Sequence, residues 1–320
     1  MKNTKTLMFI SMFATVSSAQ AAPINFDGGP VLGCDLSGWT YSCVSSPSTA
    51  SDSVAIADNY KVRSDLVADA VVVGTGSGID GNLTSEATVA FGANSYMNGT
   101  LSAGTTAAFG SGAQMNGNLT AGTTVALGAD AGMIGRLTAG TTVALGAGAF
   151  LDGDMTAGTT VALGADANVT GDLSAGTTVA LGTDAWVDGT VQAITTVALG
   201  AGALVTGDVG SSNSAVTLGV NAKVRGGLTA GTAATLGAGA SVCQSIEAVT
   251  ATLGAGAFVD QYMTVTTATL GANAYVNREL KAVTATLGAN ACYGSVVALT
   301  LTLAAGAGEC PLPRPFTLCD

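Results

Sequence analysis

Side chains that could carry out chemistry are sparse in this sequence. Its 320 residues include 21 Asp and Glu, 10 Lys and Arg, and no histidine. The chain therefore lacks the usual general base for a serine or cysteine nucleophile. Lys223 and Arg225 are the only close basic pair in the central part of the chain, and no acidic cluster lies beside them in the sequence. We predict a protein that is not an enzyme and that uses no cofactor.

The six cysteines are the other reactive side chains, and their even number predicts disulfides. Cys34 and Cys43 lie close together, so we expect them to pair. None of the six has the C-x-x-C spacing of a zinc site, and no histidine is present to complete one. We therefore predict no metal site from them.

The first 21 residues have the features of an export signal. Lys2 and Lys5 are followed by an apolar segment (7–16) and by AQA (19–21), an A-x-A cleavage site. We predict cleavage after Ala21. The apolar segment is too short to span a membrane, and no later stretch reaches about 18 uninterrupted apolar residues. We expect an exported protein with no transmembrane segment, secreted or at the cell surface, with the periplasm as a further option.

The charge of the mature chain bears on its partners. Loss of Lys2 and Lys5 with the signal changes the formal net charge from −11 to −13. Nucleic acids and anionic membrane surfaces select for basic patches. The acidic balance therefore argues against both as partners.

One motif of about 18 residues recurs through most of the chain, as in TAGTTVALGADANVTGD (156–172). A Leu-Gly step marks most copies, for instance Leu145-Gly146 and Leu163-Gly164. Apolar and polar residues alternate within a copy, which is typical of short strands with one buried side. In one copy the buried side holds Val161, Leu163, Ala165, Ala167 and Val169.

Three short strands per copy predict one coil of a β-solenoid. A single coil cannot bury its apolar side, but stacked coils bury a continuous core. We predict an all-β fold, a single-stranded β-solenoid of about fourteen coils of mostly 18 residues each, with non-repeat N- and C-terminal caps and no helix in the mature chain. At about 4.8 Å per coil the rod would be roughly 65 Å long. A glycine recurs at one corner, where a positive φ or a close backbone approach is expected, at Gly99, Gly117, Gly135, Gly153, Gly171, Gly189 and Gly207.

The repeat divides the chain into four segments. They are a signal peptide (1–21), an N-terminal cap (22–64), the β-solenoid repeats (65–303) and a disulfide-bearing tail (304–320). We expect the cap to cover the first coil, because an open solenoid end exposes strand edges that can pair. A separate recognition element is the alternative for this segment.

The remaining cysteines lie towards the C-terminus, at Cys243, Cys292, Cys310 and Cys319. Cys243 and Cys292 are three coils apart, about 14 Å, which is too far for a direct bond. The last residues hold three prolines and cannot continue the coil. We expect this tail to fold back and to tie Cys310 or Cys319 to one of the other two.

The last four coils carry a T-x-T motif on the predicted outer side, at Thr250, Thr252, Thr267, Thr269, Thr284, Thr286, Thr300 and Thr302. Alternate residues of a strand are about 6.7 Å apart and coils repeat at about 4.8 Å. These threonines would form a flat grid of methyl and hydroxyl groups that can order water, which makes them a candidate binding face. Strand propensity and stacked threonine pairs are a purely structural explanation, and a protein or glycan surface is a third.

A second outer column holds several large apolar residues. Phe150, Trp186, Phe258 and Tyr275 point outward by parity, and we interpret them as a candidate association surface. Single exposed apolar residues are also normal in soluble proteins, which leaves the alternative that they have no partner.

Acidic residues gather at one corner of the repeat, at Asp152, Asp154, Asp172, Asp188 and Asp208. Asp154 and Asp172 are one coil apart, so their carboxylates could attract Ca²⁺. The dense D-x-D-G sets of a dedicated calcium loop are missing. We favour a solvated acidic corner.

The unit VALGADANVTGDL (161–173) resembles the repeat of bactofilins, the polymer-forming cytoskeletal proteins. This resemblance covers most of residues 66–303 and implies a β-helix that polymerises end to end without nucleotide. The same repeat is similar to that of β-solenoid ice-binding proteins, which present flat ranks of threonine. LGADAG (127–132) also fits the hexapeptide rule of left-handed β-helices, but other hexads fit less well, and the handedness stays open.

The sequence favours an exported, non-enzymatic structural protein of the cell surface or extracellular matrix. It would be self-associating or polymer-forming, with itself as partner. The alternative is an ice-binding (antifreeze) protein that uses the T-x-T face, and its partner would then be ice or another surface.

Overall fold

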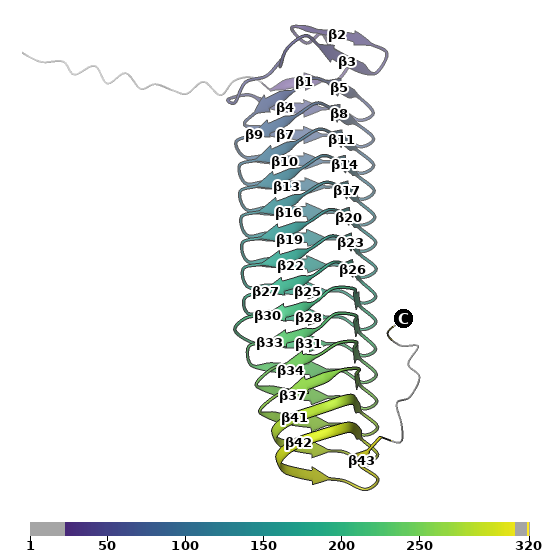
Figure 1. Ribbon diagram of the computed structural model, residues 1–320. Coiled ribbons are helices and arrows are strands. Elements are labelled where there is room, and N and C mark those ends of the chain that lie inside the picture. The colour runs from purple at the N-terminus through teal and green to yellow at the C-terminus, as the bar shows by residue number, and fades with distance from the viewer. Residues whose placement is uncertain (1–22, 311–318, 320) are drawn as a thin grey trace, which may run out of the picture.

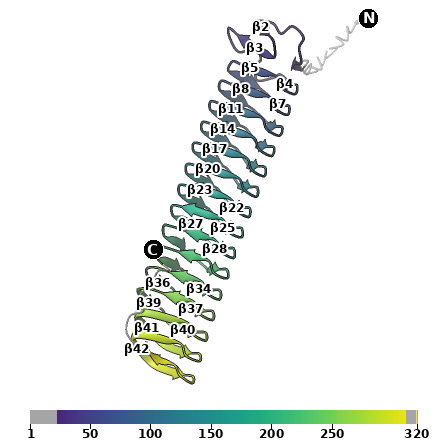
Figure 2. The ribbon, with the colours of Figure 1, turned by 90° about the vertical axis from the view of Figure 1, so that its right-hand side faces the viewer.

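In a computed structural model the chain is a long rod of stacked coils, and the structure describes residues 23–310 and 319. Figure 1 shows the rod from the side, with the N-terminal end at the top, and Figure 2 shows it after a quarter turn. The described chain holds β-strands and no helix. Each coil carries three short strands, and we call the three sides that they form the first, second and third face.

The strands pair from coil to coil, so each face is a ladder. The first face holds β1 (Ile24–Phe26), β4 (Ser53–Ile56), β7 (Ala70–Val73), β10 (Thr88–Phe91), β13 (Thr106–Phe109), β16 (Thr124–Leu127), β19 (Thr142–Leu145), β22 (Thr160–Leu163), β25 (Thr178–Leu181), β28 (Thr196–Leu199), β31 (Val216–Leu218), β34 (Ala233–Leu236), β37 (Thr250–Leu253) and β40 (Thr267–Leu270). The second face holds β3 (Thr40–Cys43), β5 (Lys61–Arg63), β8 (Gly78–Asp80), β11 (Tyr96–Asn98), β14 (Gln114–Asn116), β17 (Gly132–Ile134), β20 (Phe150–Asp152), β23 (Asn168–Thr170), β26 (Trp186–Asp188), β29 (Leu204–Val205), β32 (Lys223–Val224), β35 (Ser241–Val242), β38 (Phe258–Val259) and β43 (Gly308–Glu309). The third face holds β6 (Leu66–Ala68), β9 (Leu83–Ser85), β12 (Leu101–Ala103), β15 (Leu119–Ala121), β18 (Leu137–Ala139), β21 (Met155–Ala157), β24 (Leu173–Ala175), β27 (Val191–Ala193), β30 (Val209–Ser211), β33 (Leu228–Ala230), β36 (Ile246–Glu247) and β39 (Tyr262–Thr264). Two long strands, β41 (Tyr275–Leu287) and β42 (Cys292–Leu303), each run across all three faces, and β2 (Cys34–Ser37) lies in the cap.

The coils stack in parallel and in register. On the first face Thr142 pairs with Thr160 and then Thr160 with Thr178, so identical positions of the repeat lie one above another. The parallel strands are about 18 residues apart in sequence and form about 15 turns. The prediction of a β-solenoid is confirmed.

The interior of the coils is thin and mainly apolar, with a few buried serines such as Ser77 and Ser211. In the coil around β22 the buried side chains include Val161, Leu163, Ala167 and Val169, all at most 5% exposed. Ala165, which the alternation places inside, is exposed instead. The reason is the turn that follows β22: Ala165 and Asp166, which has a φ of 56°, form this turn outside the core, and the same alternation resumes at Ala167.

Two turns in each coil restrict which residues can occupy them, one by a positive φ and the other by close approach of neighbouring backbones. The residue equivalent to Asp166 is Asn, Asp or Gly with positive φ in most coils, including Asn94, Asp130 and Gly148. At the other corner, a side chain on Gly153 or Gly171 would collide with the backbone carbonyl of the glycine one coil earlier. The expected close approach of backbones at this corner is present.

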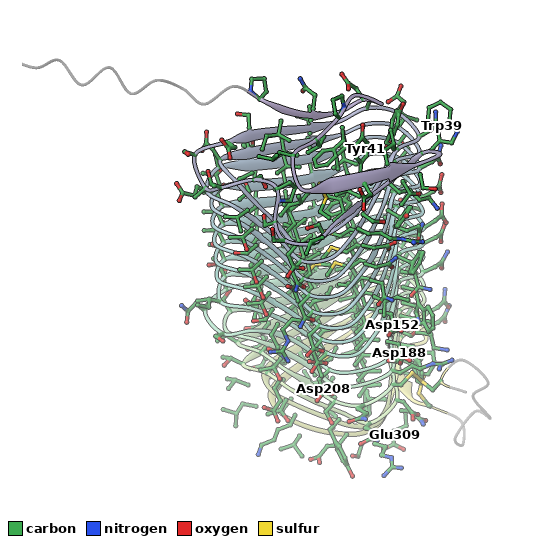
Figure 3. All side chains as sticks on the ribbon, turned by 90° about the horizontal axis from the view of Figure 1, so that it is seen from above. Trp39, Tyr41, Asp152, Asp188, Asp208 and Glu309 are labelled. Atoms are coloured by element: carbon green, nitrogen blue, oxygen red, sulfur yellow. A yellow bond between two sulfur atoms is a disulfide. The ribbon has the colours of Figure 1, made fainter. Side chains whose placement is uncertain are left out.

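The N-terminal end is covered by a hairpin. Strands β2 and β3 pair in antiparallel fashion, and β3 continues the second face by pairing with β5. Tyr41 is buried beneath the hairpin, where its ring meets Phe26 edge-on and its hydroxyl donates to the Gly29 carbonyl at 2.8 Å. Trp39 lies at the rim and packs edge-on against Tyr60 (Figure 3). We call this end the head.

The ladder is longer at both ends than the predicted span of 65–303. At the head β1 pairs with β4, and β4 pairs with β7, so coil geometry begins within 22–64. At the other end β43 pairs with β42 beyond residue 303. The predicted signal peptide and its cleavage site lie outside the described residues. Among the described residues no helix is long and apolar enough to cross a membrane.

Three disulfides join the six cysteines. Cys34 bonds to Cys43 across the head hairpin, Cys292 to Cys310, and Cys243 to Cys319. The two C-terminal bonds tie the tail back to the solenoid, as the distance between Cys243 and Cys292 predicts. The disulfides are compatible with an extracellular protein.

Candidate functional site

The C-terminal end, which we call the tail end, leaves core positions uncovered. Leu301 and Leu303 are 37% and 45% exposed, whereas Ala285 and Leu287, one coil earlier, are 0% and 1% exposed. The difference arises because no described strand stacks below residues 295–303 of β42. β43 pairs only with Cys292 and Tyr293. The tail end therefore presents both apolar side chains and unpaired backbone groups, a combination that favours pairing with another strand.

The predicted T-x-T motif forms a regular grid on the first face near the tail end. Thr250, Thr267, Thr284 and Thr300 pair in register in successive coils, and so do Thr252, Thr269, Thr286 and Thr302. Seven of the eight are exposed, and Thr284 is half-buried. The same column continues upward through Thr235 and Thr217, which are also exposed. The structure thus places all eight predicted residues together on one surface.

The rest of the first face also presents small, uncharged residues. In the coils from β10 to β28 its outer residues are Thr and Ala, as in Thr160 and Ala162. No outer residue of a first-face strand in the described chain is charged. A protein surface usually mixes charges with polar residues, so a long uncharged face is a candidate contact surface.

A second threonine column, next to this face, has a structural role. The hydroxyl groups of Thr123, Thr141 and Thr159 donate to the carbonyl of the equivalent residue one coil earlier, at 2.7–2.8 Å. These bonds join the turns of neighbouring coils. This explains why two threonines stand side by side in the repeat while only one faces outward on the strand.

The predicted association surface is only partly present on the second face. Phe150 is 38% exposed, and Trp186 and Tyr275 are half-buried. Phe258 is 1% exposed, so the expectation that it points into solvent is wrong. Its ring packs against that of Tyr275, with 4.4 Å between centroids, and Cys319 is bonded to Cys243, one coil above Phe258 on the same face. The disulfide between Cys243 and Cys319 is a contact made once, and the repeat pattern does not predict it.

The acidic residues divide between two columns at the corner between the second and third faces. Oδ1 of Asp172 accepts hydrogen bonds from the backbone and the hydroxyl of Thr190, at 2.7 and 2.9 Å. Asp154 and Asp208 accept from backbone N–H groups of the next coil in the same way. The other column, which includes Asp152 and Asp188, accepts from threonine hydroxyls. These carboxylates bind the next coil, which is a structural use of the corner.

The contacts of Asp172 predict an effect of pH. The backbone and hydroxyl hydrogen bonds from Thr190 hold the pKa of Asp172 below its ordinary value of 3.8. A lowered pKa in the folded state stabilises the fold above the ordinary value, and this contribution is lost as the pH falls through the folded-state value. We expect Asp172→Asn to reduce the loss of stability in acid below pH 3.8. Urea unfolding midpoints of both proteins across this range would measure the difference, and identical pH profiles would contradict the assignment.

No family model, curated protein or solved structure matches this chain. The solenoid geometry is therefore established by the structure alone, and function rests on the surfaces described above.

Sequence reasoning missed the tail end. The signal was present, because the last copy of the ladder reads Leu301 and Leu303 where no further copy follows to cover them. The sequence predicts non-repeat caps at both ends; the described chain has a hairpin cap at the head, but no described strand covers residues 295–303 of β42 at the tail end.

Proposed function

We propose that this protein is an exported, non-enzymatic structural protein that self-associates through its tail end. The observation that carries the proposal is the exposure of Leu301 and Leu303 at core positions. A buried leucine contributes about 1.5–3 kcal/mol relative to an exposed one, so covering this end is favourable. The head differs in its side chains, because its outermost core residues, Phe26 and Tyr41, are fully buried beneath the hairpin.

The shape of the tail end fits a second copy. Because the chain winds along the rod, its last three strand edges lie at different heights. The third-face edge (295–298) is the most recessed, the first-face edge (300–303) is intermediate, and β43 on the second face extends furthest. A two-fold axis through the first face places residues 300–303 against their own copy in antiparallel orientation. The same axis places β43 of each copy against the recessed third-face edge of the other. A closed two-fold dimer of this kind is the commonest form of homo-oligomer.

Sedimentation of the mature chain over a wide range of concentrations tests this proposal. We expect a monomer at low concentration and a dimer at high concentration. A chain that stays monomeric at the highest soluble concentration would contradict self-association.

Ice binding is the second candidate, and the exposed, in-register threonine grid favours it. Its spacings of about 4.8 Å and 6.7 Å resemble repeats in the ice lattice, and the grid carries no charge. This candidate and self-association use different surfaces of the rod, so they can be tested separately.

We predict that Thr267→Tyr and Thr284→Tyr abolish any ice activity of the protein. Each tyrosine ring would project from the flat face and prevent close contact with a crystal plane. Thermal hysteresis and inhibition of ice recrystallisation measure the effect, with Thr229→Tyr, at an exposed threonine on the third face, as the control. Wild-type protein without ice activity, or Tyr variants that keep it, would eliminate this candidate.

A further inference from the structure

A row of aromatic and polar side chains on the second face has no role in the solenoid core. Phe150, Asn168 and Trp186 occupy the same outer position in three successive coils. Beside them, Thr170 donates to Asp152 at 2.7 Å, and the next pair, Thr206 and Asp188, is joined in the same way at 2.6 Å. Figure 3 shows Asp152 and Asp188 on the same side of the rod.

The row is hollowed around Phe150. A cavity of about 470 Å³ is lined by Ile134, Phe150, Asp152, Asn168 and Thr170, together with Leu151. The Phe150 ring leans into the space left by Gly132 in the coil above, where a side chain would collide with it. The ring is therefore supported by the sheet and held beside the cavity.

One residue that lines the cavity has an unsatisfied acceptor. The side-chain oxygen of Asn168 is buried and has no hydrogen-bond partner in the described chain. Buried polar atoms are nearly always paired in folded proteins, so an exception calls for an explanation. The amide must turn towards the cavity before a ligand hydroxyl can donate to this oxygen.

We propose that this row binds an extended, neutral β-1,4-linked glycan. Phe150 and Trp186 are two coils apart, which places them about 9.6 Å apart along the rod, close to the disaccharide repeat of such a chain. Aromatic rings pack against the apolar faces of sugar rings, and carboxylate, amide and hydroxyl groups between them suit sugar hydroxyls. The nearby Arg136 is paired with Asp154 at 3.2 Å, so the site offers no free guanidinium to an acidic glycan.

Titration of the mature protein with cellohexaose and chitohexaose, followed by the fluorescence of Trp186, tests the proposal. We expect saturable binding of at least one of them and much weaker binding of maltohexaose, whose α-linked chain curves away from the row. Phe150→Ala and Trp186→Leu should each weaken binding roughly tenfold, since each removes one aromatic contact. Because Trp186→Leu removes the fluorophore, calorimetry measures the binding of that variant. Tyr262→Ala, at an exposed aromatic on the third face, should leave binding unchanged.

A double variant separates spacing from composition. Trp186→Leu with Leu204→Trp keeps the same residues in the same column but moves the indole one coil further from Phe150. Loss of glycan binding in this variant would support the match in spacing. Retention of binding, failure of both β-linked hexaoses to bind, or equal binding of maltohexaose would overturn the proposal. Dimerisation at the tail end should be unaffected in every one of these variants.

Discussion

A mature chain carrying Leu303→Glu is expected to stay monomeric at concentrations where the wild type dimerises. In the proposed dimer Leu303 is buried against a second copy, so the substitution removes apolar contact and places a carboxylate in the interface. Truncation of a hot-spot residue at the centre of an interface costs about 2 kcal/mol or more, and a buried unpaired charge adds to this. We expect the dissociation constant to rise about a hundredfold or more. Sedimentation equilibrium of the two proteins measures the change.

The control for this variant is Val283→Glu. Val283 is 47% exposed, close to the 45% of Leu303, but it lies within β41, between its third-face and first-face segments, one coil above the tail end. Its replacement should leave the dimer intact. The coil with Leu303 stays attached in the variant, because Cys292–Cys310 closes it. If both variants dimerise like the wild type, or if Val283→Glu alone disrupts the dimer, the tail end is not the interface.

Gly153→Val is expected to lower the thermal stability of the protein more than any substitution on its surface. Gly153 has a φ of 145°, and a side chain there would collide with the carbonyl oxygen of Gly135 in the coil above. Backbone strain of this kind costs about 1–3 kcal/mol, and the collision forces neighbouring coils apart in addition. We expect the unfolding midpoint to fall by about 5 °C or more, measured by circular dichroism.

Gly148→Asn is the matched control in the same coil. Gly148 also has positive φ, at 66°, but equivalent turns hold Asn94 and Asp130 with φ of 54° and 56°. A side chain there meets only the end of the Asp130 side chain, which can move. We expect a change in the midpoint within about 2 °C. Equal effects of the two substitutions would show that close backbone approach at Gly153 is not a constraint on the coil.

The repeat makes the fold predictable from sequence to an unusual degree. Alternation places Val161 and Val169 inside, the recurring glycine marks the corner, and the threonines of the last coils fall on one face, all as the structure has them. These predictions succeed because each coil meets only its neighbours, so local pattern determines packing. Ala165 fails because it lies in the turn with positive φ at Asp166, which takes it out of the core although the alternation is the same on both sides of the turn.

The features that the sequence did not predict lie where the repeat stops. Phe258 has the pattern of an exposed residue and is buried, in a region to which the C-terminal disulfides tie the tail. Leu301 and Leu303 have the pattern of core residues and are exposed, because no further coil of the described residues covers them. The periodicity of the sequence predicts the contacts that every repeat makes with its neighbours. It does not predict the contacts that occur only at one end of the rod.

Small-angle X-ray scattering of the concentrated wild-type protein tests the central claim most directly. About 15 turns at about 4.8 Å give a rod of roughly 70 Å, and a tail-to-tail dimer should have about twice that length with an unchanged cross-section. A particle of single length with a doubled cross-section would mean that the rods associate side by side. That result, or a monomer at every concentration, would contradict the account.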